Sequence, residues 1–353
     1  MIIAIQSDDY PWPKGAHPDA SAPRWAKAIE AAGHEVRWVD VYQPDILRQL
    51  DGCSALMWRF AHVTDMRQIA RRLLPVVERD LGLAVYPDQQ TSWHYDDKII
   101  QSYLFEAHGI PAPRTWVWYD RDRAMEWCKR EAEFPIVAKL WAGAGSVNVK
   151  LIRSADEAQA YVARMFDRGT YAAESESAHG FRTRLKRWLK IGRARLRPGA
   201  VIDLPEPYWD THYRYSLFQQ WLPGNEFDTR ITVIGDRAFG FRRFNRPGDF
   251  RASGSGSIDW DPQKVDPQFV RLGFKISRLL GTQSCAMDGL YRDGEPVACE
   301  ISYTYSSKAV HQCPGHWRLI GDDYESGEIE WCEGQMQPES AQVQRFLQRL
   351  ENR

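Results

Sequence analysis

Hydrophobic and polar positions in the first quarter of the chain recur with two different periods. Residues 1–7 and 55–60 are short apolar runs, which are typical of buried strands. Residues 22–33 and 66–82 instead carry apolar side chains at helical spacing. Strands that alternate with helices predict a small parallel α/β domain, which we place at residues 1–93.

The rest of the chain predicts mainly antiparallel strand pairs with few helices. One helix is expected in the run that follows Asp97, where Gly109 and Pro111 close it. Strands are expected within residues 115–119, 134–152, 215–224, 230–235, 238–244 and 288–303. We divide this part into two α+β units, a central one at residues 94–205 and a C-terminal one at residues 206–353.

Composition adds little to this picture. The 353 residues are 43% hydrophobic, which is enough for a buried core, and 46 basic against 47 acidic residues give a net charge of -1. This balance offers no global argument for a nucleic-acid or membrane partner. The start of the chain lacks the basic stretch of a signal peptide, no apolar run approaches the ~20 residues of a membrane span, and the six cysteines form no CxxC pair. We therefore expect a cytoplasmic protein with reduced thiols.

One segment departs from the even charge balance. Residues 182–197 contain eight basic residues and no acid, and their apolar residues recur near helical spacing within an insert at residues 176–205. One hypothesis is that this segment recruits an anionic acceptor, such as an anionic glycan or a lipid-phosphate-linked sugar. The alternative is a solvated helix or a mobile lid.

Asp288 and Glu300 lie twelve positions apart with a turn between them. If residues 292–294 form a three-residue turn, Asp288 lies opposite Ala298, and Glu300 points to the same face on the diagonal. Two carboxylates at that separation repel unless a cation sits between them, and oxygen-only ligands suit Mg²⁺. The alternative is that one acid is a solvated edge residue.

Two further groups of residues predict anion binding. Lys139 ends an apolar strand directly before a loop that carries Gly143, Gly145 and Ser146, where backbone N–H groups can approach phosphate closely. The loop lacks both the Walker pattern and a full GxGxxG, so a plain hairpin turn stays open. Downstream, an anion site is predicted from Arg230, Arg242, Arg243, Arg251 and Ser253. The alternative for the arginines is surface salt bridging with Asp228, Asp236 and Asp249.

In their order along residues 94–305, these motifs resemble the ATP-grasp superfamily, in particular glutathione synthetase and the ligases that add glutamate to ribosomal protein S6. The matching stations are Lys98, Lys139 with its glycine loop, the segment 219–222, Asp228–Thr229–Arg230, Arg242–Arg243, Asp288 and Glu300. The resemblance implies an α/β protein in which the N-terminal parallel domain precedes two α+β subdomains that grip ATP.

The resemblance also implies a role for each matching residue. Lys98 and Lys139 would contact the phosphates of ATP. The adenine would bind the segment Gln219, Gln220, Trp221 and Leu222. Asp228, or alternatively Glu226, would lie near the ribose. Arg230 and Arg243 would hold the γ-phosphate and the acyl phosphate made from it, and Asp288 and Glu300 would bind Mg²⁺.

The chain departs from the family pattern at two positions. Ser302 stands where the relatives usually carry an asparagine that binds the metal, so the number of Mg²⁺ ions is open. FRASGSG stands where they carry an Asn- and Gly-containing stretch, and Ser253 is the candidate that faces the phosphate.

The implied activity is that of an ADP-forming carboxylate–amine ligase, acting on a cell-envelope glycan or a small-molecule precursor. A phosphotransferase with Asp249 as its base and a non-catalytic nucleotide-binding module are the alternatives. Residues 302–317, with Lys308, are expected to line the acceptor pocket. HxCxxH at residues 311–316 with the distant Cys332 is a poor match to zinc spacing, and a compact tail packed by Trp317 and Trp331 explains it better.

Overall fold

The computed structural model describes residues 1–7, 20–62, 64–143, 148–171, 211–252, 256–321 and 323–351. The chain forms two compact units. The first unit consists of Met1–His62, Met66–Pro113 and Leu222–Arg353, and the second of Val63–Asp65 and Arg114–Trp221. The domain boundaries expected after residues 93 and 205 stay predictions.

The first unit begins with the parallel sheet that the sequence predicts. Its four strands lie in the order β2-β1-β3-β4, and all neighbouring pairs are parallel. The strands are β1 (Ile2–Gln6), β2 (Glu35–Val39), β3 (Ala55–Met57) and β4 (Ala84–Tyr86). The helices around them are α1 (Ala22–Ala31), α2 (Ile46–Gln49), α3 (Thr64–Pro75) and a π-helical turn, η1 (Val76–Asp80).

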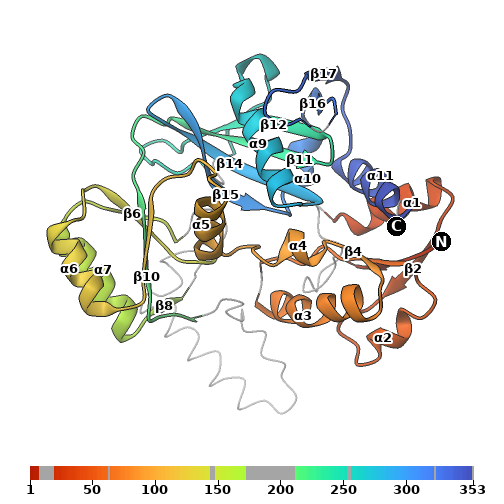
Figure 1. The fold of residues 1–353 in the computed structure, drawn as a ribbon, viewed down its shortest axis with the longest axis horizontal. Coiled ribbons are helices and arrows are strands. Elements are labelled where there is room, and N and C mark those ends of the chain that lie inside the picture. Colours follow the sequence, from red (N-terminus) through yellow and green to blue (C-terminus); the bar gives the residue numbers. More distant parts are fainter. Residues whose placement is uncertain are drawn as a thin grey trace, which may run out of the picture. The chain divides into compact units, whose positions relative to one another are not determined.

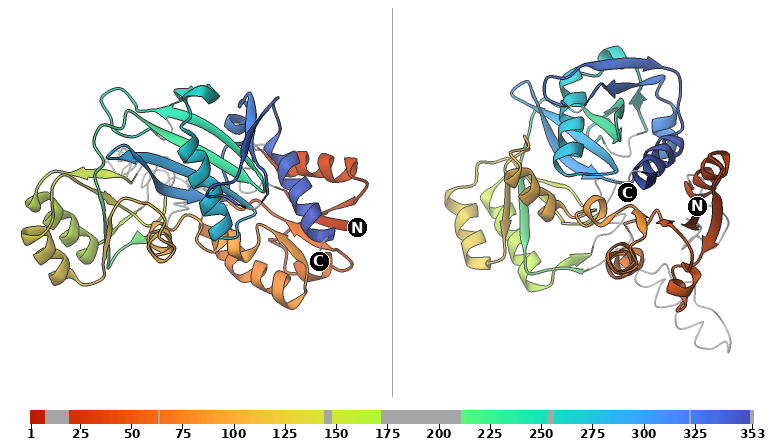
Figure 2. Two further views of the ribbon diagram at one scale, coloured as in Figure 1. Left: turned by 45° about the horizontal axis from the view of Figure 1, so that its top comes forward. Right: turned by 45° about the vertical axis from the view of Figure 1, so that its right-hand side comes forward.

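The last helix of the chain, α11 (Pro338–Glu351), belongs to the core of this parallel sheet. It lies beside α1, as both Figure 1 and Figure 2 show. The indole Nε1 of Trp25 donates to Oε1 of Gln342 at 2.8 Å, and Phe346 packs in the same cluster as Ile3 and Ile5. No local pattern predicts this contact, because it joins segments more than 300 residues apart.

The second unit is built on an antiparallel sheet in the order β5-β10-β6-β7. Its elements are β5 (Thr115–Trp118), α6 (Arg121–Arg130), β6 (Ile136–Lys139), β7 (Lys150–Ile152), α7 (Ala155–Asp167) and β10 (Ser216–Gln220), with a short pair β8 (Thr170–Tyr171) and β9 (Thr211–His212). Trp127 of α6 packs on Trp116 and Phe218 at ring-centroid distances of 5.1 and 5.5 Å. The basic segment 182–197 lies outside the described residues.

The large sheet of the first unit has the strand order β15-β14-β11-β12-β16-β17, with β13 paired to β12. Its strands are β11 (Phe227–Ile234), β12 (Arg237–Phe244), β13 (Ile258–Asp259), β14 (Ser284–Arg292), β15 (Glu295–Ser302), β16 (Gly315–Leu319) and β17 (Ile329–Glu333). The remaining helices are α4 (Gln89–Ser92), α5 (Lys98–Ala107), the 3₁₀ turn η3 (Pro262–Lys264), α9 (Pro267–Leu279) and α10 (Ser307–His311). None of the helices in the described ranges is long and apolar enough to cross a membrane.

Helix α9 covers one face of this sheet (Figure 1). Phe269 and Phe274 of α9 are fully buried against Ile231 and Met287 of the strands. Close approach depends on Gly289, since a Cβ added there would lie 2.3 Å from Cε1 of Phe269. Because α9 occupies this face, the functional side chains of β11 and β14 must use the other one.

We expect Gly289→Ala to lower the free energy of unfolding by about 2 kcal/mol, because the added methyl group overpacks the contact with Phe269. Phe269→Leu should relieve part of this clash, so the double variant should lose about 1 kcal/mol less than the sum of the two single variants. Urea denaturation of all four proteins measures this coupling, and strict additivity would contradict the packing argument.

Candidate active site

Five of the predicted site residues share the sheet face that α9 leaves open. Cross-strand register places Asp228 of β11 opposite Arg243 of β12, Arg230 of β11 opposite Asp288 of β14, and Asp288 opposite Glu300 of β15. Directly opposed residues point to the same face, and positions two apart on one strand do as well. The five side chains therefore form a continuous row across four neighbouring strands.

The hairpin that carries the two acids differs from its prediction in register. Its turn has two residues, Asp293 and Gly294, both with positive φ (54° and 86°), and the expected three-residue turn is wrong. A two-residue Asp-Gly turn of this kind would pair Asp288 with Cys299 in a regular ladder. A bulge between Asp288 and Gly289 shifts the pairing by one, so Glu300 faces Asp288 after all.

Two arginines hold Asp288. Nε and Nη2 of Arg230 donate to Oδ1 and Oδ2 of Asp288 at 2.5 and 2.6 Å, and Nη2 of Arg243 donates to Oδ2 at 2.8 Å. Arg243 also donates through Nε and Nη2 to the two oxygens of Asp228, both at 2.7 Å. Two acids and two bases therefore alternate in one hydrogen-bonded cluster with no net charge.

The cluster changes the proton affinity of its acids in opposite directions. Burial acts to raise the pKa of Asp288, but the charges of Arg230 and Arg243 outweigh it and hold this pKa well below its usual range. Burial and the charge of Asp288 raise the pKa of Asp228, which Arg243 only partly offsets. Of these two acids, Asp288 is thus the one more firmly kept in its charged form.

Helix α5 brings Lys98 to the same row. Asp97 caps the helix, accepting from the backbone N–H groups of Ile99 and Ile100 at 3.1 and 3.0 Å. Nζ of Lys98, the first helical residue, lies 3.1 Å from Oε1 of Glu300 and 3.9 Å from Oδ1 of Asp96. Burial disfavours the charged amine, but Glu300 and Asp96 more than compensate and raise the pKa of Lys98.

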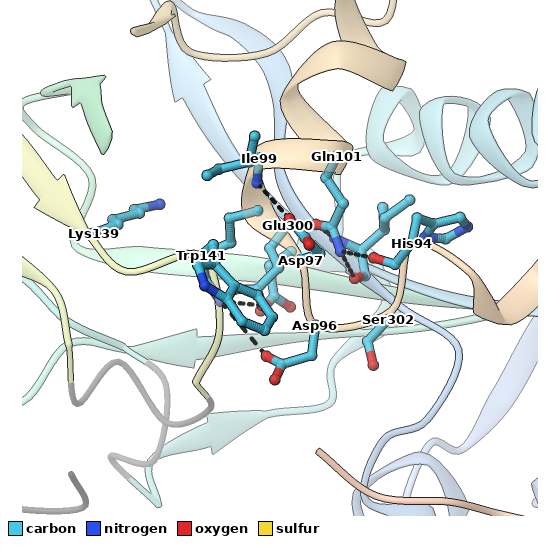
Figure 3. A network of polar contacts seen from close by, with 12 residues as sticks. His94, Asp96, Asp97, Ile99, Gln101, Lys139, Trp141, Glu300 and Ser302 are labelled. Atoms are coloured by element: carbon cyan, nitrogen blue, oxygen red, sulfur yellow. Dashed lines mark hydrogen bonds and ion pairs between the residues drawn. The ribbon is translucent and has the colours of Figure 1, made fainter. Parts of the chain in front are cut away.

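Gln101 fixes α5 against β15. Its amide Nε2 donates to the carbonyl of Ile301 at 2.8 Å and to that of His94 at 3.2 Å, while its Oε1 accepts from the N–H of Ile301 at 3.1 Å. Figure 3 shows Gln101 between the His94 backbone and the strand that carries Glu300. Gln101 was not predicted, because only the fold brings it to a strand 200 positions away.

The donor set of Asp288 and Glu300 fits Mg²⁺. Both are carboxylates, they face each other across two paired strands, and the contact with Lys98 uses one oxygen of Glu300. Mg²⁺ commonly binds one or two carboxylates and completes its shell with water and substrate phosphates. The Ser302 hydroxyl donates to the carbonyl of Thr304 at 2.6 Å, so its proton is committed to a local turn.

The structure separates the predicted arginines. Arg242 points to the α9 side, where it donates to Oδ2 of Asp259 at 2.6 Å and lies over the rings of Phe227 and Phe244. Of the adjacent pair, only Arg243 therefore reaches the acidic row. Arg251 donates to Asp249 within its own turn at 2.6 to 3.0 Å, and its neighbour Ser253 lies outside the described residues.

The predicted nucleotide residues of the second unit lie on paired strands. Nζ of Lys139 on β6 donates to Oε1 of Gln219 on β10 at 2.5 Å. The backbone N–H of Gln220 donates to the carbonyl of Arg114 at 2.8 Å. Gly143 has φ of 120°, a conformation that favours glycine. Gly145 and Ser146 lie outside the described residues, and Trp221 ends the unit.

The two candidates for the ribose differ sharply in exposure. Asp228 is 9% exposed and has both oxygens engaged by Arg243, whereas Glu226 is exposed and directly precedes β11. Leu222 is buried, and its carbonyl accepts from Asn225 at 3.3 Å. Asn225, which the sequence analysis missed, also bonds the backbone N–H and carbonyl of Tyr291, which joins this segment to β14.

Two aromatic residues of the segment after Glu300 belong to the protein core, and its role in an acceptor pocket stays a prediction. Tyr303 and Tyr305 are buried, and Tyr303 donates through its hydroxyl to the carbonyl of Phe60. Tyr305 bonds Ser284 and Gln342. These two aromatic residues stabilise the core, and Lys308 is exposed on α10.

His316, Cys332 and Cys313 of the tail take part in its strands and core. His316 lies opposite Cys332 in the β16–β17 hairpin, and Cys313 is buried with its thiol on the carbonyl of Gly240. No group of three or more His, Cys, Asp and Glu side chains in the described ranges is arranged to hold a metal. Trp317 and Trp331 pack edge to face at 4.8 Å, as the alternative predicted.

The chain is distantly similar to proteins of known activity. Comparison with models of protein families gives no match. A stretch of 202 residues, 57% of this chain and 58% of the relative, is 23% identical to the alpha-aminoadipate–LysW ligase LysX of Saccharolobus solfataricus. The match thus spans less than two thirds of LysX.

Solved structures resemble the fold over most of its length. A RimK domain protein ATP-grasp from Sphaerobacter thermophilus superposes with a TM-score of 0.50 at 17% identity, covering 88% of this chain and 94% of that one. The ATP-grasp ligase PsnB, solved with minimal precursor, Mg and ADP, gives a TM-score of 0.52 at 16% identity, with 88% and 92% covered.

Acid pH should destabilise the protein through His94. This residue is 2% exposed, neither ring nitrogen has a hydrogen-bond partner in the described part of the chain, and burial lowers its pKa from 6.5 to about 4. A depressed pKa stabilises the fold above pH 6.5, and this contribution is lost as the pH falls toward 4. Between pH 7 and pH 5 it amounts to about 2 kcal/mol.

His94→Leu should remove most of this pH dependence, whereas His108→Leu, at an exposed position, should leave it intact. Urea denaturation at pH 7 and pH 5 compares the three proteins. An acid dependence in His94→Leu equal to that of the wild type would exclude His94 as the cause.

Proposed function

We propose that this chain, which has the ATP-grasp fold, is an ADP-forming ligase that joins a carboxylate to an amine. The observation that carries the proposal is the row of Glu300, Asp288, Arg230 and Arg243 on one sheet face, with Lys98 beside Glu300. A reaction on the γ-phosphate of ATP needs this combination of metal-binding acids and phosphate-binding bases.

In the first step, an oxygen of the acceptor carboxylate attacks the γ-phosphorus of ATP, and the bond to ADP breaks. Arg230 and Arg243 stabilise the charge of the transferring group, while Lys98 and Lys139 bind the phosphates. Asp288 and Glu300 would hold Mg²⁺, which would supply charge neutralisation for the triphosphate. The product is an acyl phosphate.

In the second step, the nitrogen of the amine attacks the acyl carbon. The bond to phosphate breaks, inorganic phosphate leaves, and the nitrogen loses a proton to give the amide. Neither step requires a nucleophile from the protein, so catalysis consists of positioning and electrostatic stabilisation. The residues on the open sheet face are suited to both.

A phosphotransferase is less well supported by the structure. It would need a general base near the γ-phosphate, and Asp249 was the candidate. Arg251 donates to both oxygens of Asp249, and its hydrogen bonds lower the pKa of that carboxyl. A carboxylate with a depressed pKa is a weak base.

The basic segment suggests the class of acceptor. Residues 182–197 would attract an anionic acceptor, such as a cell-envelope glycan, or the substrate would be a small-molecule precursor. The similarity to the alpha-aminoadipate–LysW ligase LysX adds an amino acid as a further substrate class to test.

Ligase activity predicts ADP formation together with a hydroxamate when hydroxylamine replaces the amine. A panel of carboxylates with ATP and Mg²⁺ should yield both products for the correct acceptor class. Glu300→Gln should lower both rates at least about 100-fold, because one metal-binding oxygen is lost. Glu295→Gln, at the exposed end of the same strand, is the matched control and should retain activity. ADP without hydroxamate, accompanied by a phosphorylated hydroxyl, would replace the ligase by a phosphotransferase.

We further propose that Glu226, the exposed one of the two ribose candidates, binds a ribose hydroxyl. Glu226→Gln should weaken binding of a non-hydrolysable ATP analogue about tenfold, since a charge-assisted hydrogen bond is replaced by a neutral one. Isothermal titration calorimetry measures this, with Glu295→Gln as control. Unchanged affinity would leave the ribose to another residue.

A further inference from the structure

Asp288, the proposed metal ligand, is already occupied by the protein itself. Its two oxygens accept three hydrogen bonds, two from Arg230 and one from Arg243. An ionised carboxylate offers about four lone-pair positions. A divalent cation that binds Asp288 must therefore compete with guanidinium groups and not only with water.

Arg243 can leave Asp288 without being left unpaired. Its Nε and Nη2 both donate to Asp228, so this bidentate contact persists when the bond from Nη2 to Asp288 is lost. Asp228 offers little to a ligand, because the residue is only 9% exposed and both oxygens accept hydrogen bonds from Arg243. Its geometry suits the holding of an arginine and not the binding of a sugar.

The same edge of each guanidinium faces a carboxylate. Arg230 and Arg243 both use Nε and Nη2 for their acidic partners, and neither donates through Nη1 to any residue in the described ranges. Nη1 carries two further donors. Both arginines are thus fixed at one edge and keep donors at the other, which is the arrangement needed to bind phosphoryl oxygens.

We propose that Asp228 is a positioning residue for Arg243, and that Arg230 and Arg243 occupy Asp288 until a divalent cation displaces them from this carboxylate and frees their donors for the transferring phosphoryl group. Metal binding and the presentation of the arginines are then one coupled event. This inference rests on the proposed function, because it takes Asp288 as a metal ligand and the γ-phosphate as the target. It changes the role of Asp228 from ribose contact to arginine support.

If the arginines compete with the metal for Asp288, removing one of them should change metal affinity in the absence of nucleotide. Arg243→Met removes one competitor for Asp288 and should tighten Mn²⁺ binding about tenfold, the effect of one charge-assisted hydrogen bond. Arg243→Lys keeps the charge but loses the bidentate fork, so its affinity should fall between those of the wild type and Arg243→Met. Free Mn²⁺ is measured by electron paramagnetic resonance on the full chain.

Arg242→Met is the matched control. Arg242 is the next residue on the same strand, carries the same charge, and is held on the other sheet face by Asp259. Its replacement should change Mn²⁺ affinity less than twofold. An equal gain in Arg242→Met, or no gain in Arg243→Met, would overturn the inference. If the wild type binds no Mn²⁺ even with a non-hydrolysable ATP analogue, the proposed function fails first and the inference falls with it.

Asp228→Asn tests the positioning role separately. The variant should bind the ATP analogue within about threefold of the wild type, because Asp228 does not touch the nucleotide, while ADP formation should fall about 100-fold at saturating ATP. Asp228→Glu, which restores the charge, should recover part of the rate. A tenfold loss of affinity for the ATP analogue with an unchanged maximal rate would instead indicate that Asp228 contacts the ribose. Thermal unfolding of each variant identifies any that fails to fold, and Arg243→Met then decides alone.

Discussion

The pairing of buried charges on one face of the large sheet is the interaction on which the site depends. Removing one partner of a buried ion pair typically costs about 3–5 kcal/mol, because the remaining charge is left desolvated. Asp228, Arg230, Arg243 and Asp288 therefore constrain one another. They also constrain the register of β11, β12 and β14, since a one-residue slip of any strand would turn its charged side chain into the apolar layer under α9.

The opposite face of the sheet explains why this row is so well defined. Helix α9 is held close by contacts that leave no room for a Cβ at Gly289. Tight packing on one side fixes the strands, and the strands fix the direction of the charged side chains on the other. Gln101 extends the same order to α5 by bonding both backbone groups of Ile301, so Lys98 meets Glu300 from a separate element.

Local patterns were sufficient for much of the fold and for the identities of the charged residues. Period-two alternation predicted the strands that carry Arg230, Asp288 and Glu300, and the order of motifs predicted the ATP-grasp fold. What the sequence could not decide was set by contacts between distant segments. Only strand register decides that Arg243, and not Arg242, faces the acids. The same register places Asp228 opposite Arg243, which binds both of its oxygens. Gln101 and α11 make contacts with residues about 200 and 300 positions away, respectively, and no local sequence pattern predicts such contacts.

The bulge at Cys299 also bears on how this hairpin can change during evolution. Asp288 and Glu300 are an even number of residues apart, and in a hairpin with a two-residue turn they share a face only because the bulge gives β15 one residue more than β14. Loss of a single residue between them would be absorbed by closing the bulge into a regular ladder, with the two acids still opposed. A deletion that would invert an ordinary strand is therefore tolerated here, and homologues whose acids are separated by eleven residues can keep the same arrangement.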